Sequence, residues 1–561
     1  MANKKRKQQS FEYGAIILLC STMIVKLIGA IFKIPLSNLI GDLGFGYFSS
    51  AYDLFTPIYS LSMAGLPIAV SRLVAENMTA GRYRDVHQSL KVTKRAFFVT
   101  GFVGFVLMLL LIYPFVKITD ATGKTIYSLF AIAPSLVFCC VMSTYRGYYE
   151  GLRNMYPTAL SDIIEASGKL VLGLGFAFAV MKLTDNVALA AAGAMLGITV
   201  GAGLSALYLR LRFKFKGDMI TEEELEGSAE PLSQSATLKA LIAIAIPVVV
   251  SSLANNIASL VDVSMVKWQL ANLMESSGEV ITSMYKTSID AYNAAASEVL
   301  TVDAIPTFLY GIRGKAFTVY NLIPTITSVL GVSALPVLAS SWVLKDKSLI
   351  KKNVDSMIKM TALISMPAGA GLVALGGQIM GLLYTSVASV EIGGAMMRIF
   401  GFAAFFAGLA IPMTSMLQAV GHQVAALRNV AIGAVLKIIV NFVLVGVPQT
   451  NIQGAAFGTL ASYLFIFVAN LLTLIKVTGV KPTFSKVLIK PFIAALLCGM
   501  AAYFTSLIGG GRTVTLLSIV VAAVVYVIVL ILLNTFERED VLALPKGEKL
   551  LNICLKLKII R

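Results

Sequence analysis

Charged residues, histidine and cysteine are all scarce in this chain. Only 13% of its 561 residues are charged, and it contains two histidines and five cysteines. No two of the cysteines have the spacing of a metal site, and they do not suggest a disulfide framework. The composition therefore gives no support to a metal centre, a disulfide-stapled scaffold or histidine-based catalysis, and we expect no cofactor.

Hydrophobic residues make up 57% of the chain and recur in runs long enough to cross a bilayer. A helix of about 20 apolar residues spans the roughly 30 Å hydrocarbon core. We predict fourteen such spans, at residues 12–34, 46–70, 95–117, 125–147, 157–181, 187–210, 239–264, 315–342, 357–384, 391–417, 423–446, 453–476, 487–508 and 513–535.

Lysine and arginine placement predicts the orientation of these spans. If the Lys4–Lys7 cluster is cytoplasmic and the sides alternate, inner segments hold 33 of the 46 basic residues and outer segments hold eight. This asymmetry is typical of an even number of spans with both termini on the cytoplasmic side. The basic residues lie in short loops between spans, so we expect no nucleic-acid partner.

The remaining five basic residues fall inside predicted spans. A charge at bilayer depth costs about 2.5–3.5 kcal/mol even on lenient scales, so it normally faces a cavity or a partner. Cavity cations in a chain without an enzyme motif favour a transporter of anions or anionic lipids. These residues are Lys26, Lys33, Lys169, Arg398 and Lys437.

An internal repeat accompanies the spans. Tyr52-Asp53-Leu54 matches Tyr320-Asn321-Leu322, and the helix with Lys169 matches the helix with Lys437, both at an offset of 268 residues. Six spans followed by six similar spans predict parallel repeats related by an axis along the membrane normal. The expected fold is thus an all-α integral membrane protein with fourteen helices: two six-helix bundles related by this pseudo-two-fold axis, plus two C-terminal helices.

The spans divide the chain into segments. Residues 217–238 read as a flexible cytoplasmic linker, and the long outer loop 265–313 is either a helical lid or a tolerated insertion. The tail is basic and amphipathic, and we expect it to lie on the inner membrane surface. The predicted organisation is a basic N-terminus (1–11), an N-terminal bundle (12–216), the linker (217–238), a C-terminal bundle (239–477), helices thirteen and fourteen (478–535) and the tail (536–561).

Several short motifs, in order along the chain, resemble one family. They are KLIGAIFKIPL (26–36), GFGYFSSAYDL (44–54), GLP (65–67), YRGYYEG (145–151), LYG (309–311), NLIP (321–324) and QAVGH (418–422). Together with the span count, they resemble the polysaccharide-transport members of the MOP flippase superfamily, in the SpoVB/YtgP branch that includes MurJ-type lipid II flippases.

The resemblance implies a V-shaped pair of bundles around a cationic central cavity. It implies inward-to-outward movement of undecaprenyl-pyrophosphate-linked saccharides, with a groove for the lipid tail at the last two helices. Carried onto this chain, it points to Lys26 and Lys33 in the first span, to Asp53 in the second, and to Arg313 and Lys315 at the start of the eighth.

The resemblance also raises the question of a sodium site between spans seven and eleven. Asp262 is available there, but Lys437 and Asn441 replace the extra carboxylate. A fixed lysine stands in for the ion, so we predict no metal site. Asp53 and Asp262 either neutralise a lysine or exchange a proton during transport, or else they form structural salt bridges.

Helical spacing adds further candidates. Lys26 and Lys33 are seven residues apart and share a face, which suits a pyrophosphate, while snorkelling is the alternative for Lys33. Glu150 lies four positions after Arg146, one helical turn away, so the two side chains can form an ion pair at an inner gate. One face of span five carries a charged stripe that must point inward, made of Asp162, Glu165 and Lys169.

The expected function is a flippase for an anionic polyprenyl-pyrophosphate-linked glycan such as lipid II, and we expect it to act as a monomer. Coupling to a proton gradient or to the membrane potential stays open. A related MATE-type antiporter would need acidic cavities for cationic drugs, whereas basic groups outnumber acidic ones in these spans. A membrane glycosyltransferase would need catalytic groups in sizeable outer loops, yet His87 and His422 both fall on the inner side.

Overall fold

The computed structural model describes residues 11–63, 65–218, 220–296 and 299–535, and every regular element in these ranges is a helix. Twelve helical segments among these residues are long and apolar enough to cross a membrane, so the chain is a multi-pass membrane protein. The count of fourteen stays a prediction. The Lys4–Lys7 cluster and the tail 536–561 lie outside the described residues.

The chain forms two compact units. Unit 1 comprises Met1–Ala271 with Leu300–Gly311, and unit 2 comprises Asn272–Val299 with Ile312–Arg561. The border therefore falls within two helices, α9 (Gln234–Met284) and α11 (Ile305–Tyr320). The chain enters unit 2, returns to unit 1 for a short helical segment, and then completes unit 2.

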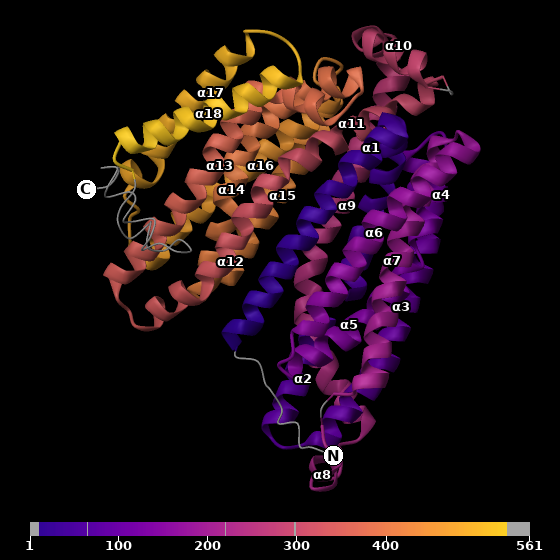
Figure 1. Ribbon diagram of the computed structural model, residues 1–561, viewed down its shortest axis with the longest axis vertical. Coiled ribbons are helices and arrows are strands. Elements are labelled where there is room, and N and C mark those ends of the chain that lie inside the picture. The colour runs from indigo at the N-terminus through magenta and orange to yellow at the C-terminus, as the bar shows by residue number, and fades with distance from the viewer. Residues whose placement is uncertain (1–10, 64, 219, 297–298, 536–561) are drawn as a thin grey trace. The chain divides into compact units, whose positions relative to one another are not determined.

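Unit 1 is built from long helices joined by short turns (Figure 1). Besides the first part of α9 and the start of α11, it contains α1 (Phe11–Met63), α2 (Leu66–Thr79), α3 (Tyr83–Thr119), α4 (Thr125–Ile132), α5 (Ser135–Gly151), α6 (Tyr156–Thr184), α7 (Val187–Lys216), the short α8 (Glu222–Glu226) and the 3₁₀ turn η1 (Val302–Ala304).

Helix α1 is a hairpin of two helical segments. Its turn is Gly41, whose φ of 69° and ψ of −171° are not helical and favour glycine. The ring centroids of Phe32 and Phe48 lie 5.9 Å apart, whereas 16 residues of continuous helix would separate them by roughly 24 Å. The predicted spans 12–34 and 46–70 therefore pack against each other, and the second one continues into α2.

Glycines allow α6 and α7 to pack backbone against backbone, and Figure 1 shows the two helices side by side. A Cβ at Gly197 would lie 2.3 Å from Gly173 Cα, and one at Gly168 would lie 2.7 Å from Gly201 Cα. Such close approach is how membrane helices gain packing energy without a hydrophobic driving force. This contact fixes the position of α6, which carries the charged stripe.

The linker after α7 is anchored to α3 and α5. Asp218 Oδ2 lies 2.6 Å from His87 Nε2 and accepts a 2.5 Å hydrogen bond from Tyr148. Burial alone would favour the neutral carboxyl, but these two hydrogen bonds outweigh it and hold the pKa of Asp218 below its usual range. Leu232 N donates to Asp85, 2.8 Å away. Hydrogen bonds therefore anchor the segment 217–238 at Asp218 and at Leu232, and its flexibility stays a prediction.

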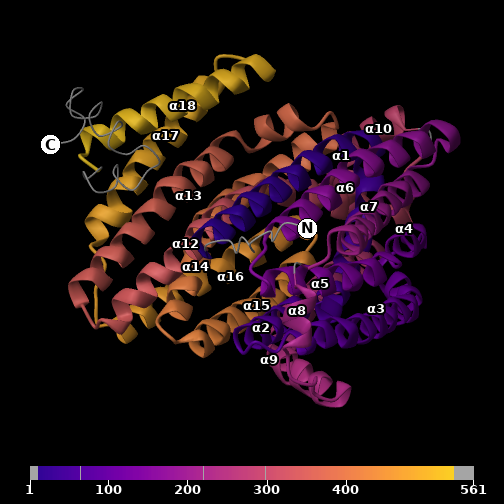
Figure 2. The same cartoon turned by 60° about the horizontal axis from the view of Figure 1, so that its bottom comes forward.

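Unit 2 is a second set of long helices. It contains the end of α9, α10 (Lys286–Ala295), the end of α11, α12 (Leu322–Val343), α13 (Lys347–Leu383), α14 (Gly394–Ala419), α15 (Gln423–Val445), α16 (Gly454–Thr478), α17 (Lys490–Ser506) and α18 (Arg512–Leu532), with short turns η2 (Ser389–Gly393), η3 (Asn451–Gln453) and η4 (Ser485–Ile489). The last two helices, α17 and α18, lie side by side in both views (Figures 1 and 2).

Most of the segment expected to be an outer loop, 265–313, is helical. Helix α9 continues to Met284, and α10 follows directly. Within unit 2, Tyr285 donates a 2.6 Å hydrogen bond to Asn451 Oδ1, and Ser288 donates a 2.5 Å bond to Glu391 Oε2. These bonds fasten α10 to the turns that precede α14 and α16.

Large apolar side chains cover the outside of several helices. Leu110 and Tyr113 on α3 are 69% and 71% exposed, and Leu532 at the end of α18 is 72% exposed. Continuous apolar surface of this kind is unfavourable in water and normal against lipid. The exposed hydrophobic residues thus agree with the length of the helices in marking a membrane protein.

Replacing Gly197 with alanine tests the α6–α7 contact. We expect a cost of about 1–3 kcal/mol, because the new methyl group must push two backbones apart. The measurement is the thermal unfolding midpoint of the purified protein in detergent. Gly175→Ala on α6 is the control, since its Cβ would meet nothing within 4 Å. Equal midpoints for the two variants would show that the close contact does not stabilise the unit.

Candidate functional site

Unit 1 contains a pocket of about 380 Å³ between α1, α5, α6 and α7. Its polar lining includes Arg146 from α5, and Asp162, Glu165 and Lys169 from α6. We call it the Arg146 pocket. The three α6 residues are at spacings of three and four and share one helical face, so the packing of α6 brings all three to the same cavity. Tyr52, Phe55 and Tyr59 of α1 form an aromatic wall.

Arg146 is the centre of the polar network in this pocket. Its Nη1 lies 2.8 Å from Asp162 Oδ1, and its Nη2 lies 2.9 Å from Glu165 Oε2. Its Nε donates a 2.8 Å hydrogen bond to Ser161 Oγ, and Nη2 also reaches Ser205 Oγ at 3.3 Å. All three guanidinium nitrogens are thus engaged, in the planar geometry that suits arginine and not lysine.

This network differs from the predicted one. In the part of the chain that the structure describes, the ion pairs of Arg146 are with Asp162 and Glu165, and Glu150 is not among its partners. The packing of α5 on α6 brings the carboxylates of Asp162 and Glu165 to Arg146, and these form the ion pairs in place of Glu150. The pocket also carries two acidic groups beside its two cations, so the charges of its lining balance.

Lys169 lies one turn beyond Glu165, against aromatic rings. Its Nζ is 4.9 Å from the ring centroid of Tyr52 and 5.3 Å from that of Phe32. The Nζ of Lys33 is 5.5 Å from the same Tyr52 ring. Two predicted cations that are 136 residues apart in sequence therefore share one aromatic partner through cation–π contacts. We call Lys33 and Lys169 the lysine pair.

The other first-span cation is placed differently. Lys26 is exposed on α1, although its neighbours Val25 and Ile28 line the Arg146 pocket. Lys33 is half-buried, and it too lies outside the lining. The structure thus brings Arg146, Asp162, Glu165 and Lys169 together, with Lys33 adjacent through Tyr52, and it leaves Lys26 outside.

Sequence reasoning missed a buried lysine in α9. Lys267 is fully buried, and its Nζ donates a 2.8 Å hydrogen bond to Ser50 Oγ. Its Nζ also lies 5.5 Å from the Tyr310 ring, and Tyr310 donates a 2.6 Å hydrogen bond to Asp53. The predicted span ended at residue 264, which placed Lys267 in an outer loop. A continued helical pattern beyond residue 264 was the signal that could have found it.

The predicted cations at the start of span eight lie in unit 2 and are buried in α11. Arg313 has its guanidinium carbon 5.6 Å from the ring centroid of Phe317. The Nζ of Lys315 donates a 3.3 Å hydrogen bond to Ser389 Oγ, and the Tyr384 hydroxyl donates to the Lys315 carbonyl. These contacts join α11 to the segment before α14.

The remaining candidates are spread over other helices. Asp262 is buried in α9 of unit 1, and Glu150 is half-buried near the end of α5. In unit 2, Lys437 is partly exposed on α15, and Arg398 is exposed on α14. None of these four residues lines the Arg146 pocket.

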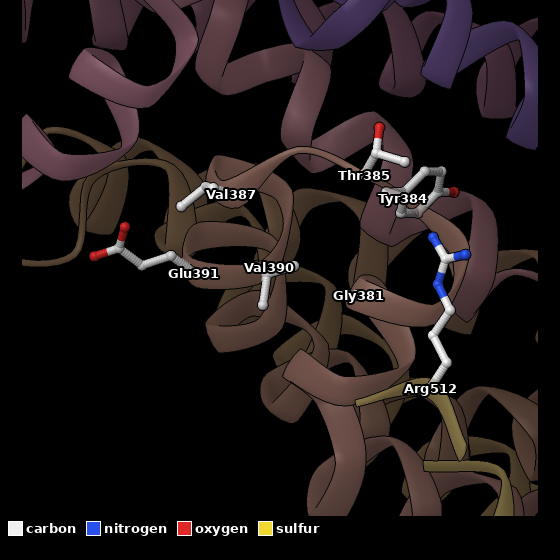
Figure 3. A pocket seen from close by; sticks show the side chains of 7 residues that line it. All are labelled: Gly381, Tyr384, Thr385, Val387, Val390, Glu391 and Arg512. Carbon is white, nitrogen blue, oxygen red and sulfur yellow. The ribbon is translucent and has the colours of Figure 1, made fainter. Parts of the chain in front are cut away.

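Unit 2 has a pocket of about 530 Å³ that no predicted site residue lines. Its lining comes from the end of α13, the turn before α14 and the first residue of α18 (Figure 3). In Figure 3 the guanidinium of Arg512 extends towards Tyr384, while the carboxylate of Glu391 points away from both. This pocket combines one cation and one carboxylate with apolar walls.

These features define a class of protein: a polytopic helical membrane protein with charged groups held at a pocket inside a helical unit. The family described as polysaccharide biosynthesis protein matches residues 13–276, and the family described as lipid II flippase MurJ matches residues 318–534. Together these two matches and the relatives described next support the MOP flippase superfamily, in its SpoVB/MurJ-like branch.

Individual proteins agree with this assignment. The chain is 26% identical over 497 residues to stage V sporulation protein B of Bacillus subtilis (strain 168), covering 88% of each chain. It is 25% identical over 469 residues to lipid II flippase MurJ of the same organism, covering 81% of each. The fold is similar to that of a lipid II flippase MurJ in an inward closed conformation, with a TM-score of 0.63 and 12% identity over 92% of this chain and 97% of that one.

A further solved structure shares the fold. An inward-facing multidrug resistance MATE family transporter of the MOP superfamily has a TM-score of 0.61 and 14% identity, covering 83% of this chain and 99% of that one. The same helical architecture is therefore found in proteins whose names point to different cargoes. The cargo has to be argued from the charged groups of the site.

Replacing Arg146 with glutamine tests whether it holds the network together. We expect a loss of about 2–4 kcal/mol in stability, because Asp162 and Glu165 lose their shared cation. The thermal unfolding midpoint in detergent should fall by several degrees. Arg153→Gln is the control, since Arg153 is exposed in the turn after α5. An Arg146→Gln midpoint equal to that of the control would contradict the role given to the two ion pairs.

Proposed function

We propose that this protein is a flippase that moves an undecaprenyl-pyrophosphate-linked saccharide from the inner to the outer leaflet of a bacterial plasma membrane. The cargo that the charges favour is the peptidoglycan precursor lipid II or a related polysaccharide precursor. The family assignment supports transport of this class, and no bond is broken in the process.

The observation that carries the proposal is the lysine pair beside the Arg146 pocket. Both carboxylates of the pocket are bound to Arg146, whereas among the described residues neither Lys33 nor Lys169 has a carboxylate within ion-pair distance. Two such ammonium groups inside membrane helices are expensive unless an anion joins them during the transport cycle. A pyrophosphate fits this requirement, because it carries several negative oxygens in a small volume.

The size of the pocket limits what it holds. About 380 Å³ is in the range of sites for small molecules, so it accommodates the pyrophosphate and a neighbouring sugar, not a whole lipid-linked glycan. The aromatic wall of α1 provides stacking surface for the apolar face of a sugar ring. The polyprenyl tail would then stay in the lipid, in keeping with the groove that the family resemblance assigns to the last two helices.

Lysine is suited to a transient grip. An ammonium is a point charge without the bidentate fork of arginine, so it holds a phosphate less rigidly and releases it more readily. Arginine in this site has the structural task and lysine faces the cargo. Alternating access of the two units, driven by a proton gradient or by the membrane potential, would carry the anion across.

Replacing Lys169 tests the proposal in cells depleted of their native flippase. The measurement is the accessibility of lipid II at the outer leaflet. The unaltered protein should restore outward movement, and Lys169→Ala should reduce the restored rate about tenfold or more, because a charge-assisted phosphate contact is lost. Lys182→Ala is the matched control, since Lys182 is on the same helix, exposed and outside the pocket.

The second candidate function is a cation antiporter of the MATE type. The observation in its favour is that Asp162 and Glu165 line the pocket, as acidic groups must in a site for cationic drugs. If the protein inserts in the membrane but restores no lipid II movement, and instead lowers the accumulation of a cationic dye, the flippase proposal is wrong. If Lys169→Ala and Lys182→Ala restore outward movement of lipid II at the same rate, the lysine pair does not contact the cargo.

A further inference from the structure

A basic pocket lies in unit 2, away from every residue discussed as a cargo site. Its volume is about 530 Å³, and it is formed where the turn between α14 and α15 meets the last turns of α16. Its six lining residues include three basic side chains and no carboxylate. They are His422, Arg428, Leu472, Thr473, Lys476 and Val477.

In the part of the chain that the structure describes, the basic side chains of this pocket have no acidic partner. Among the described residues, neither Arg428 nor Lys476 takes part in an ion pair, and the hydrogen bond of the Arg428 guanidinium is a long one of 3.5 Å to Asn429 Oδ1. Orientation in the membrane explains why basic residues are frequent at one end of the helices. It does not explain why three of them converge on one concave site without an acidic partner.

A network of side-chain hydrogen bonds connects the helices that form the basic pocket. Asn429 Nδ2 donates to Asn470 Oδ1 at 3.1 Å and to Thr473 Oγ1 at 3.2 Å. Asn470 in turn donates to Thr414 Oγ1 at 2.8 Å. The network links α14, α15 and α16 through the buried side chains of Asn429 and Asn470, so it holds together the two helices that carry Arg428 and Lys476.

Apolar surface adjoins the charges. Leu472 lines the basic pocket and is 62% exposed, and Val424 in the first turn of α15 is 77% exposed. Exposed leucine and valine on a membrane helix face hydrocarbon. The site therefore presents cations at the end of a helix pair and an apolar wall directly beside them. This is the chemistry of an amphiphile whose head group is an anion.

We propose that the basic pocket binds the phosphate of an anionic phospholipid. Arg428 and Lys476 hold the phosphodiester, His422 supplies a ring nitrogen as a further donor, and Leu472 contacts the start of an acyl chain. A lysine or arginine near an anionic lipid surface contributes about 1 kcal/mol to the binding free energy. Basic pockets between membrane helices are known to bind anionic phospholipid head groups. The lipid bound there joins α15 to α16 and is not transported cargo.

Binding of fluorescent phosphatidylglycerol to the purified full-length protein in detergent tests this site. The double variant Arg428→Gln/Lys476→Gln should bind the probe about 10- to 30-fold more weakly, as expected for the loss of two basic contacts. Lys481→Gln is the matched control, because Lys481 is exposed just beyond α16 and does not line the basic pocket. It should bind like the unaltered protein.

Four competitors separate the possible sources of the phosphate group. Unlabelled phosphatidylglycerol should displace the probe, whereas phosphatidylcholine and inorganic phosphate at matched concentrations should not. Displacement by inorganic phosphate alone would overturn the lipid assignment, and preferential displacement by undecaprenyl pyrophosphate would make this a cargo site.

A photoreactive phosphatidylglycerol supplies an independent readout. It should label peptides of α15 and α16 in the unaltered protein and in Lys481→Gln, and labelling should be lost in the double variant. The unfolding midpoint without lipid shows whether the double variant is folded. If it is not, the single variant Arg428→Gln takes its place with an expected loss of about fivefold. Equal probe affinity in all folded variants would overturn the proposal.

Discussion

The double ion pair of Arg146 is the interaction on which the arrangement of the site depends. It joins α5 to two positions on α6, and each of the three guanidinium nitrogens already has a partner in the protein. Both carboxylates of the stripe are paired with Arg146, whereas Lys169, one turn beyond Glu165 on the same helix, lies against the Tyr52 and Phe32 rings. If an anion enters this pocket, the ammonium of Lys169 is, among the described residues, the positive group that is not paired with a carboxylate, because both carboxylates are paired with Arg146.

Close packing of helix backbones brings the partners of Arg146 and Lys169 together. The glycine contacts between α6 and α7 bring Ser205 of α7 within reach of Arg146, and Ser205 also donates a 2.8 Å hydrogen bond to the Ser161 carbonyl. The hairpin at Gly41 places the Phe32 and Tyr52 rings beside Lys169. Polar and aromatic partners of the charged stripe thus come from three different helices, and small residues allow them to approach.

Helical periodicity was enough to predict part of this site, and tertiary packing decided the rest. The spacing of Asp162, Glu165 and Lys169 correctly indicated a shared face, because that face follows from helix geometry alone. The predicted partner of Arg146, Glu150, was wrong. Local sequence points only to a residue one turn away, whereas the actual partners come from a neighbouring helix. Lys267 was missed because apolar content falls after residue 264 while the helix continues, supported by contacts with distant segments such as Ser50.

We infer that Arg146 acts in transport by occupying two carboxylates and not by binding cargo. Purified protein in liposomes, with a fluorescent polyprenyl-pyrophosphate sugar whose transbilayer movement is followed by quenching from outside, tests this directly. Arg146→Gln should abolish movement, because Asp162 and Glu165 then turn to Lys169. The triple variant Arg146→Gln/Asp162→Asn/Glu165→Gln should recover it, because no carboxylate remains to occupy the lysine. If the triple variant folds but is as inactive as the single one, Arg146 does not act through the two carboxylates and is itself a ligand of the cargo.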